Sequence, residues 1–229
     1  MQNYTTSKKR LSNLDRSKLS IKYPLNEIII GLLLGDGHIQ HRSLNDNSRF
    51  IYGQSSLRKH HFNYFNHVFE LFQPYLSKSF KFKERSFKDK RTKNKYSSVN
   101  FATLSLPCFN LYRNLFYNSD NIKIVPLNIH KLLTPRGLAY WIMDDGSLQN
   151  KGLHLNTYNF TNEEVLNLKR TLENMFLDLT NNSLNCSIHK HSKGPRIYVW
   201  EESIGIIRDH ISQFMHKDML YKIDYAKFK

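Results

Sequence analysis

One apolar segment that ends on a carboxylate constrains the fold of this chain more than any other feature. In the stretch EIIIGLLLGDGHIQ, residues 27–40, seven of the first eight positions are apolar or glycine, and the run stops at Asp36 between Gly35 and Gly37. If the segment is a buried helix, Asp36 lies at its C-terminal end, where free carbonyl groups already make the potential negative. A carboxylate is unfavourable for stability at this position, so we expect it to serve function.

The same pattern occurs a second time, in TPRGLAYWIMDDGSLQ at residues 134–149. Thr134 is a natural N-cap and Pro135 a natural first helical residue, and the apolar run that follows again ends on an Asp-Gly pair. Aligning the two copies matches Asp36 with Asp145, Gly37 with Gly146 and Gln40 with Gln149. Asp144 falls opposite Gly35, so we interpret Asp145 as the repeated carboxylate and Asp144 as a solvated group at the helix end.

The segments that follow each copy repeat as well. Strand-like residues at 48–56 and 152–160 come first, with polar side chains between branched and aromatic ones. Amphipathic helices follow, with apolar residues spaced three, four and three apart: Phe62, Phe65, Phe69 and Phe72, then Val165, Leu168, Leu172 and Met175. Further strand-like pairs (78–87 with 96–104, and 185–192 with 195–203) precede a third helix, which Pro107 opens in the first half.

Each half therefore has the predicted order αββαββα, and the fold class is α+β with two pseudo-symmetric half-domains. We expect an N-terminal arm at residues 1–20, a first half-domain at 21–121, a linker at 122–133 and a second half-domain at 134–229. With 229 residues the chain can bury a core of this size.

The two apolar helices are expected to pack against each other. Gly31 and Gly35 in the first helix, and Gly137 and Ala139 in the second, would let the backbones approach closely. Parallel packing would bring two carboxylates together at two negative helix ends, which is unfavourable unless cations are shared between them. Oxygen ligands suit Mg²⁺, which keeps several waters and takes further ligands from substrate phosphates. The pattern thus predicts phosphodiester hydrolysis assisted by two metal ions.

The segments IIGLLLGDG (29–37) and LAYWIMDDG (138–146) resemble the two copies of the LAGLIDADG motif. The arrangement is similar to that of single-chain LAGLIDADG homing endonucleases of organellar introns, from about residue 20 to residue 225. Leu34, Tyr140 and Met143 depart from the motif at positions that concern packing, whereas the motif carboxylate is present in both copies.

The resemblance implies a saddle-like antiparallel DNA-binding sheet in each half, with the halves packed through the motif helices. It also implies that Asp36 and Asp145 are catalytic metal ligands, together with the backbone of Gly35 and of Asp144. The expected cofactor is Mg²⁺, as two or more divalent ions, with Mn²⁺ or Ca²⁺ able to replace it for binding. In the family a lysine near each active site organises water around the scissile phosphate. Lys123 and Lys222 follow the third helix of each half and are the candidates.

The charge of the chain indicates a polyanionic partner. It has 34 Lys and Arg against 19 Asp and Glu, a formal net charge of +15. The resemblance implies double-stranded DNA as the partner, and the strands after each motif suit its major groove, which admits a two-stranded ribbon. In the first half the candidate DNA-binding residues are Gln40, Arg42, Arg49, Tyr52, Gln54, Lys81, Lys83 and Arg85. In the second half they are Gln149, Lys151, His154, Asn156, Tyr158, Lys190, Lys193 and Arg196.

Three alternatives stay beside this interpretation. A histidine-based nuclease is disfavoured because adjacent His60 and His61 would point about 100° apart on a helix. A DNA-binding regulator would not need both aspartates, whereas an intron maturase, with intron RNA as its partner, could retain them. We expect a monomer with no membrane association, because no apolar run is long enough to span a bilayer. Organelle encoding is expected, in a mitochondrion or alternatively a chloroplast, since the residue usage is typical of an AT-rich genome.

Overall fold

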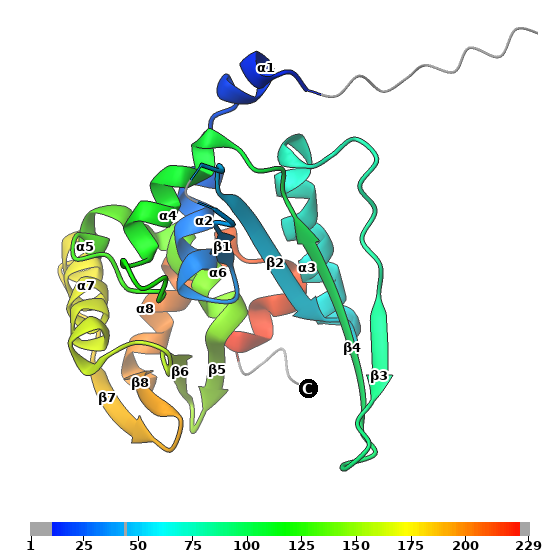
Figure 1. Cartoon of the computed structure of the whole chain (residues 1–229). Coiled ribbons are helices and arrows are strands. Elements are labelled where there is room, and N and C mark those ends of the chain that lie inside the picture. The colour runs from blue at the N-terminus through cyan, green and yellow to red at the C-terminus, as the bar shows by residue number, and fades with distance from the viewer. Residues whose placement is uncertain (1–10, 44, 225–229) are drawn as a thin grey trace, which may run out of the picture.

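The chain folds into two halves with the same order of elements. A computed structural model describes residues 11–43 and 45–224 (Figure 1). The first half contains α2 (Leu25–Leu34), β1 (His38–Gln40), β2 (Arg49–Ser55), α3 (Lys59–Phe72), β3 (Arg85–Lys88), β4 (Lys95–Ala102) and α4 (Asn110–Phe116). The second contains α6 (Pro135–Asp145), β5 (Gly146–Gln149), β6 (Gly152–Asn156), α7 (Asn162–Thr180), β7 (Cys186–His191), β8 (Gly194–Val199) and α8 (Glu201–Ile211). The predicted α+β class with two αββαββα halves is confirmed.

Each half contains one four-stranded antiparallel sheet, in the order β1-β2-β4-β3 and β5-β6-β8-β7. Tyr52 pairs with Phe101 in the first sheet, and Leu155 pairs with Ile197 in the second. All four side chains are buried. Because side chains alternate along a strand, helices cover this face of each sheet and the other face is open. The helix α3 covers the first sheet, whereas α7 and α8 cover the second (Figure 1).

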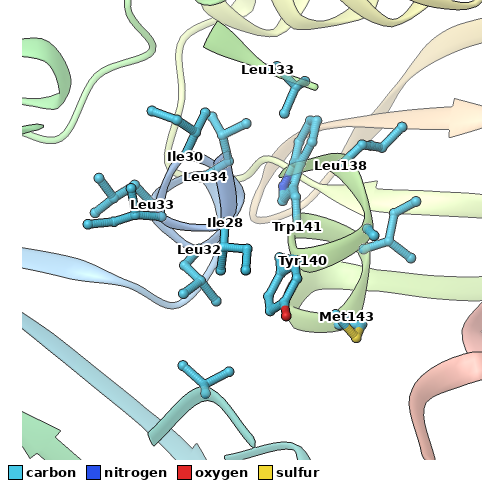
Figure 2. Close-up of a cluster of buried hydrophobic side chains, with 14 of the residues drawn as sticks. Ile28, Ile30, Leu32, Leu33, Leu34, Leu133, Leu138, Tyr140, Trp141 and Met143 are labelled. Carbon is cyan, nitrogen blue, oxygen red and sulfur yellow. The ribbon is translucent and has the colours of Figure 1, made fainter. Parts of the chain in front are cut away.

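The two motif helices, α2 and α6, pack closely through glycine. A Cβ atom on Gly31 would lie 1.9 Å from the carbonyl oxygen of Gly137, so only glycine allows this approach. Large apolar side chains of both helices surround the contact (Figure 2), and Trp141 is fully buried. At the C-terminal end of α2, the backbone of Gly35 packs against the side chain of Asp144. The helices therefore run in the same direction, with their C-terminal ends together.

Local signals explain where several elements begin. The Thr134 side chain accepts a hydrogen bond from the Gly137 N–H, and Pro135 is the first residue of α6. In α7 the Thr161 hydroxyl accepts from the Glu164 N–H, and the Glu164 carboxylate accepts from the Thr161 N–H, which forms a capping box. The helix predicted to start at Thr134 and Pro135 is confirmed, and the predicted stripe of Val165, Leu168, Leu172 and Met175 lies on α7.

The strand predicted at 78–87 is shorter in the structure, where β3 begins only at Arg85. Phe80 and Phe82 instead pack against Phe69, with ring centroids 6.1 and 5.1 Å apart. Burial of the two rings therefore holds this segment against α3 in place of a longer β-ladder.

The segment between the halves packs closely on the core. Val125 and Ile129 are buried, and α5 (Ile129–Leu132) leads directly to the N-cap of α6. In the predicted arm, α1 (Asn13–Ser17) is an exposed short helix, and residues 1–10 lie outside the described part. Across residues 11–43 and 45–224, no helix combines the length and apolarity that a membrane span requires.

Candidate active site

Two aspartates meet where the motif helices end. Gly35 caps α2, Asp36 follows it directly, and Asp145 is the last residue of α6. Removal of water by the surrounding protein, together with the charge of Asp36, raises the pKa of Asp145 from 3.8 to about 7. Desolvation also raises the pKa of Asp36. The hydrogen bond from Gln54 and the positive charges of Lys222 and Lys123 act in the opposite direction. The site therefore brings together two carboxylates whose negative charges the nearby lysines and Gln54 stabilise only in part.

Asp144 lies between the two motif helices and links them. Its carboxylate accepts a hydrogen bond from the Tyr52 hydroxyl (2.7 Å) and another from the Asp36 backbone N–H (3.1 Å). A Cβ atom on Gly35 would lie 2.5 Å from the Asp144 Cβ, so glycine leaves room for this side chain. The interpretation of Asp144 as a solvated helix-end group is wrong, because the side chain fills the space that the glycine opposite it vacates.

The prediction that Tyr52 contacts DNA is also wrong. Tyr52 is fully buried on the helix-facing side of β2, between Phe65 and Phe101. Gln54 lies two residues further along the same face and reaches the acidic site, where its amide donates to Asp36 (2.6 Å). Strand alternation was the signal that could have placed both residues on the inner face.

The two predicted lysines occupy matching positions beside the helix ends. The ammonium of Lys123 donates to the carbonyls of Gly35 and Gly37, each at 2.9 Å. Lys222 is buried and donates to the carbonyls of Asp144 (2.9 Å) and Met143. Burial lowers the pKa of Lys123 to about 8, against the opposing effect of the three nearby aspartates. The carbonyls at the end of each motif helix therefore already accept hydrogen bonds from a lysine ammonium group.

The surroundings of the two carboxylates differ. By the strand register, Thr157 of the second half stands where Gln54 stands in the first, and its hydroxyl donates to the Pro195 carbonyl at 2.8 Å. A cavity of about 210 Å³ opens beside Asp145 and is lined by Leu34, Gly35, Lys123, Asn156, Thr157, Tyr158, Asn159, Phe160 and Lys193. It brings together four predicted residues besides Gly35 and Asp145: Lys123, Asn156, Tyr158 and Lys193.

The other candidate DNA-binding residues lie mostly on the open faces or at their edges. The side chains of Arg42, Lys81, Lys83, Arg85, Gln149, Lys151, Lys190 and Lys193 are exposed, and those of Gln40, Arg49, Asn156, Tyr158 and Arg196 are partly exposed. The Gln40 amide oxygen accepts from Arg49 at 2.8 Å, so these two side chains form a unit.

The position of His154 differs from the prediction. It lies on the open face of the second sheet, but only 4% of its surface is exposed. The rings of Tyr198 and His189 cover it, at centroid distances of 4.6 and 5.6 Å. Because these rings cover it, His154 does not contact a base in this arrangement. Strand alternation gives the face on which a residue lies but not its burial by cross-strand neighbours, so the prediction missed this cover.

The residues at the site fit a hard divalent cation. Asp36 and Asp145 offer carboxylate oxygens, and the carbonyls of Gly35 and Asp144 each retain a second lone pair beside their lysine contact. Within the described residues, no group of three or more His, Cys, Asp or Glu side chains is arranged to hold a metal. Two carboxylates and two backbone carbonyls therefore suit an ion, such as Mg²⁺, that takes its remaining ligands from water and phosphate.

Comparison with known proteins agrees with this geometry. A model of the LAGLIDADG DNA endonuclease family matches residues 26–207. DNA endonuclease I-ChuI of Chlamydomonas applanata is 26% identical over 214 residues, which cover 90% of this chain and 96% of that protein. Cytochrome b mRNA maturase bI2 of Saccharomyces cerevisiae is 29% identical over 212 residues, which cover 87% of this chain but 48% of the maturase.

A solved structure is similar over nearly the whole chain. The homing endonuclease I-WcaI bound to its DNA recognition sequence superposes with a TM-score of 0.81 at 25% identity, and the match covers 96% of both chains. The fold and the paired acidic helix ends thus define a pseudo-symmetric nuclease. This chain belongs to the LAGLIDADG DNA endonuclease family. It is a DNA homing endonuclease, with maturase relatives at similar identity, and the nuclease family implies divalent metal ions.

Proposed function

We propose that this endonuclease hydrolyses one phosphodiester on each strand of a long, asymmetric DNA site and depends on Mg²⁺. The observation that carries the proposal is the meeting of Asp36 and Asp145 at adjoining helix ends, where both carboxyl pKa values are raised. A divalent cation would relieve the repulsion, which the described residues compensate only in part.

Each residue of the site has a proposed role. Asp36 and Asp145 would hold the metal ions, with backbone oxygens of Gly35 and Asp144 as further ligands. Bound Mg²⁺ would supply charge stabilisation for the attacking and leaving oxygens. Gln54 orients the Asp36 carboxylate through its amide, as its 2.6 Å hydrogen bond indicates.

Lys123 and Lys222 would act as fixed positive charges beside the scissile phosphates. Their hydrogen bonds to the helix-end carbonyls hold the ammonium groups close to the aspartates. Their low exposure keeps this charge in a region where it is weakly screened, and electrostatic stabilisation is strongest in such a region.

DNA binding is proposed for the open faces of both sheets. The net charge of +15 supports phosphate contacts, which position a protein on a duplex without reading its sequence. The two open faces carry different side chains, so the preferred site would be asymmetric. One chain contains both halves and both aspartates, which supports action as a monomer.

A second candidate function is intron splicing, because the maturase bI2 is 29% identical over 212 residues. Retention of Asp36 and Asp145 favours DNA cleavage as the primary activity. If the protein also acts in splicing, the same chain would bind intron RNA in addition to DNA. We place the protein in the mitochondrion, with the chloroplast as the alternative, since its relatives include a cytochrome b mRNA maturase and intron-encoded endonucleases.

The test is incubation of the protein with a plasmid that carries the joined exons around the encoding intron. We expect linearisation at one site with Mg²⁺, and none with EDTA or with the Asp36→Asn variant. Intact plasmid at every Mg²⁺ concentration would contradict the proposal. Splicing of the intron transcript that requires the protein, without DNA cleavage, would favour the maturase function instead.

A further inference from the structure

The hairpin formed by β3 and β4 carries an exposed aromatic pair. It projects from the body of the first half, and its last ladder pair joins Lys88 and Lys95 (Figure 1). Phe87 and Tyr96 face each other across the two strands, with ring centroids 5.4 Å apart and ring planes at 22°. Their exposed fractions are 61% and 42%. Two large rings are therefore stacked on each other while their outer surfaces remain in water.

The pair lies on the open face of the sheet. Phe87 pairs with Tyr96, and two residues along the ladder Arg85 pairs with Ser98, so these side chains share one side. On the opposite side Ser97 is buried and donates to the Glu84 carboxylate at 2.7 Å. The aromatic pair therefore continues the surface that the proposed function assigns to DNA.

The charges around the pair fit a phosphate backbone. Residues 85–95 contain six basic side chains, Arg85, Lys88, Lys90, Arg91, Lys93 and Lys95, against one acid, Asp89. The Asp89 carboxylate accepts hydrogen bonds from the backbone N–H groups of Arg91 (2.8 Å) and Thr92 (2.7 Å), so it serves the turn. Repulsion between two such hairpins opposes self-association through the rings. Double-stranded DNA fits both the charges and the rings, because its phosphates are negative and its major groove exposes the apolar methyl groups of thymine.

We propose that Phe87 and Tyr96 determine specificity for thymine in the half of the target that the first sheet contacts. In the major groove, thymine differs from every other base by its C5-methyl group, and an apolar side chain reads that methyl by contact. Polar base edges placed against the rings would lose hydrogen bonds to water without replacement. The inference rests on the proposed DNA binding and assigns a chemical preference to this part of it.

A cross-strand aromatic pair also stabilises a hairpin. The two roles differ in one measurable respect, because only contact with the methyl group makes binding depend on thymine against deoxyuridine. Burying one methyl contributes about 0.8 kcal/mol. Deoxyuridine at a contacted position should therefore weaken binding about fourfold.

The experiment begins with selection of the preferred site from a randomised duplex library in Ca²⁺. Each thymine of the first half-site is then replaced singly by deoxyuridine, and affinity is measured for wild type, Phe87→Ser and Tyr96→Ser. Leu111→Ser is the matched control, since Leu111 is also 61% exposed but belongs to the helix α4 and not to the β3–β4 hairpin. Melting curves verify that each variant is folded.

We expect wild type and Leu111→Ser to lose affinity about fourfold at one or two thymines. Phe87→Ser and Tyr96→Ser should bind thymine and deoxyuridine equally there. The inference is overturned if wild type tolerates every replacement, if it selects no thymine in that half-site, or if both serine variants keep the thymine dependence. An equal loss for all sequences would assign the pair to hairpin stability alone. Absence of any specific DNA binding would instead contradict the proposed function.

Discussion

Replacing Asp145 by Asn should stabilise the metal-free protein at neutral and alkaline pH. The folded state holds the pKa of this carboxyl near 7, against an ordinary value of 3.8, because surrounding protein and Asp36 disfavour its charge. A group with a raised carboxyl pKa binds more protons folded than unfolded. Its presence therefore costs no stability below about pH 4 and lowers stability progressively as pH rises to about 7.

The size of the effect follows from that shift. Three pKa units correspond to about 4 kcal/mol, which is an upper bound. Asp145 borders a cavity open to water and is only partly buried, so screening reduces the expected gain to about 1 to 2 kcal/mol. In a chain of this length the gain corresponds to about 2 to 8 °C in melting temperature.

The assay is thermal unfolding in EDTA at several pH values between 4 and 8.5, for wild type and Asp145→Asn. The two proteins should melt together near pH 4, and the variant should gain its advantage between pH 4 and pH 7 and keep it above. A variant that melts below wild type at pH 8 would refute the reasoning. The carboxylate would then be a structural hydrogen-bond acceptor and would not be a strained charge kept for a metal.

Three further changes, one of them with a matched control, test the packing and the chemistry of the site. Gly31→Ala would place a Cβ 1.9 Å from the Gly137 carbonyl and should destabilise by about 2 kcal/mol or more in denaturant unfolding; Gly205→Ala, with nothing within 4 Å, should be neutral or slightly stabilising. Tyr52→Phe removes the donor to Asp144 and should cost about 1 to 2 kcal/mol in the same assay, and unchanged stability would contradict that bond. Lys222→Met should slow cleavage while DNA affinity stays within a few-fold, and normal cleavage rates would rule out its catalytic role.

The sequence predicted the overall architecture because the repeat of its two halves can be read along the chain and the signals within each half are local. The helix that starts at Thr134 and Pro135 needs only a cap and a fixed φ angle, and both act within one turn. The matched lysines could be placed because they follow the third helix of each half. Their contacts with the helix-end carbonyls match that placement.

The parts of the site that were missed depend on distant neighbours. Asp144 is held by Tyr52, 92 residues away, and by Asp36 from the other helix. His154 is buried by Tyr198 and His189, which belong to strands later in the chain. Neither relation leaves a pattern in the local sequence. Strand alternation alone could have moved Tyr52 and Gln54 to the inner face.

We propose that Asp36 and Asp145 serve cleavage and do not serve DNA binding. The most direct measurement is cleavage rate and DNA affinity for wild type, Asp36→Asn and Asp145→Asn on one labelled target duplex, with Mg²⁺ for cleavage and Ca²⁺ for binding. We expect cleavage to be lost in both variants while the dissociation constant changes by no more than a few-fold. Cleavage that survives either change, or affinity that falls together with it, would contradict the account.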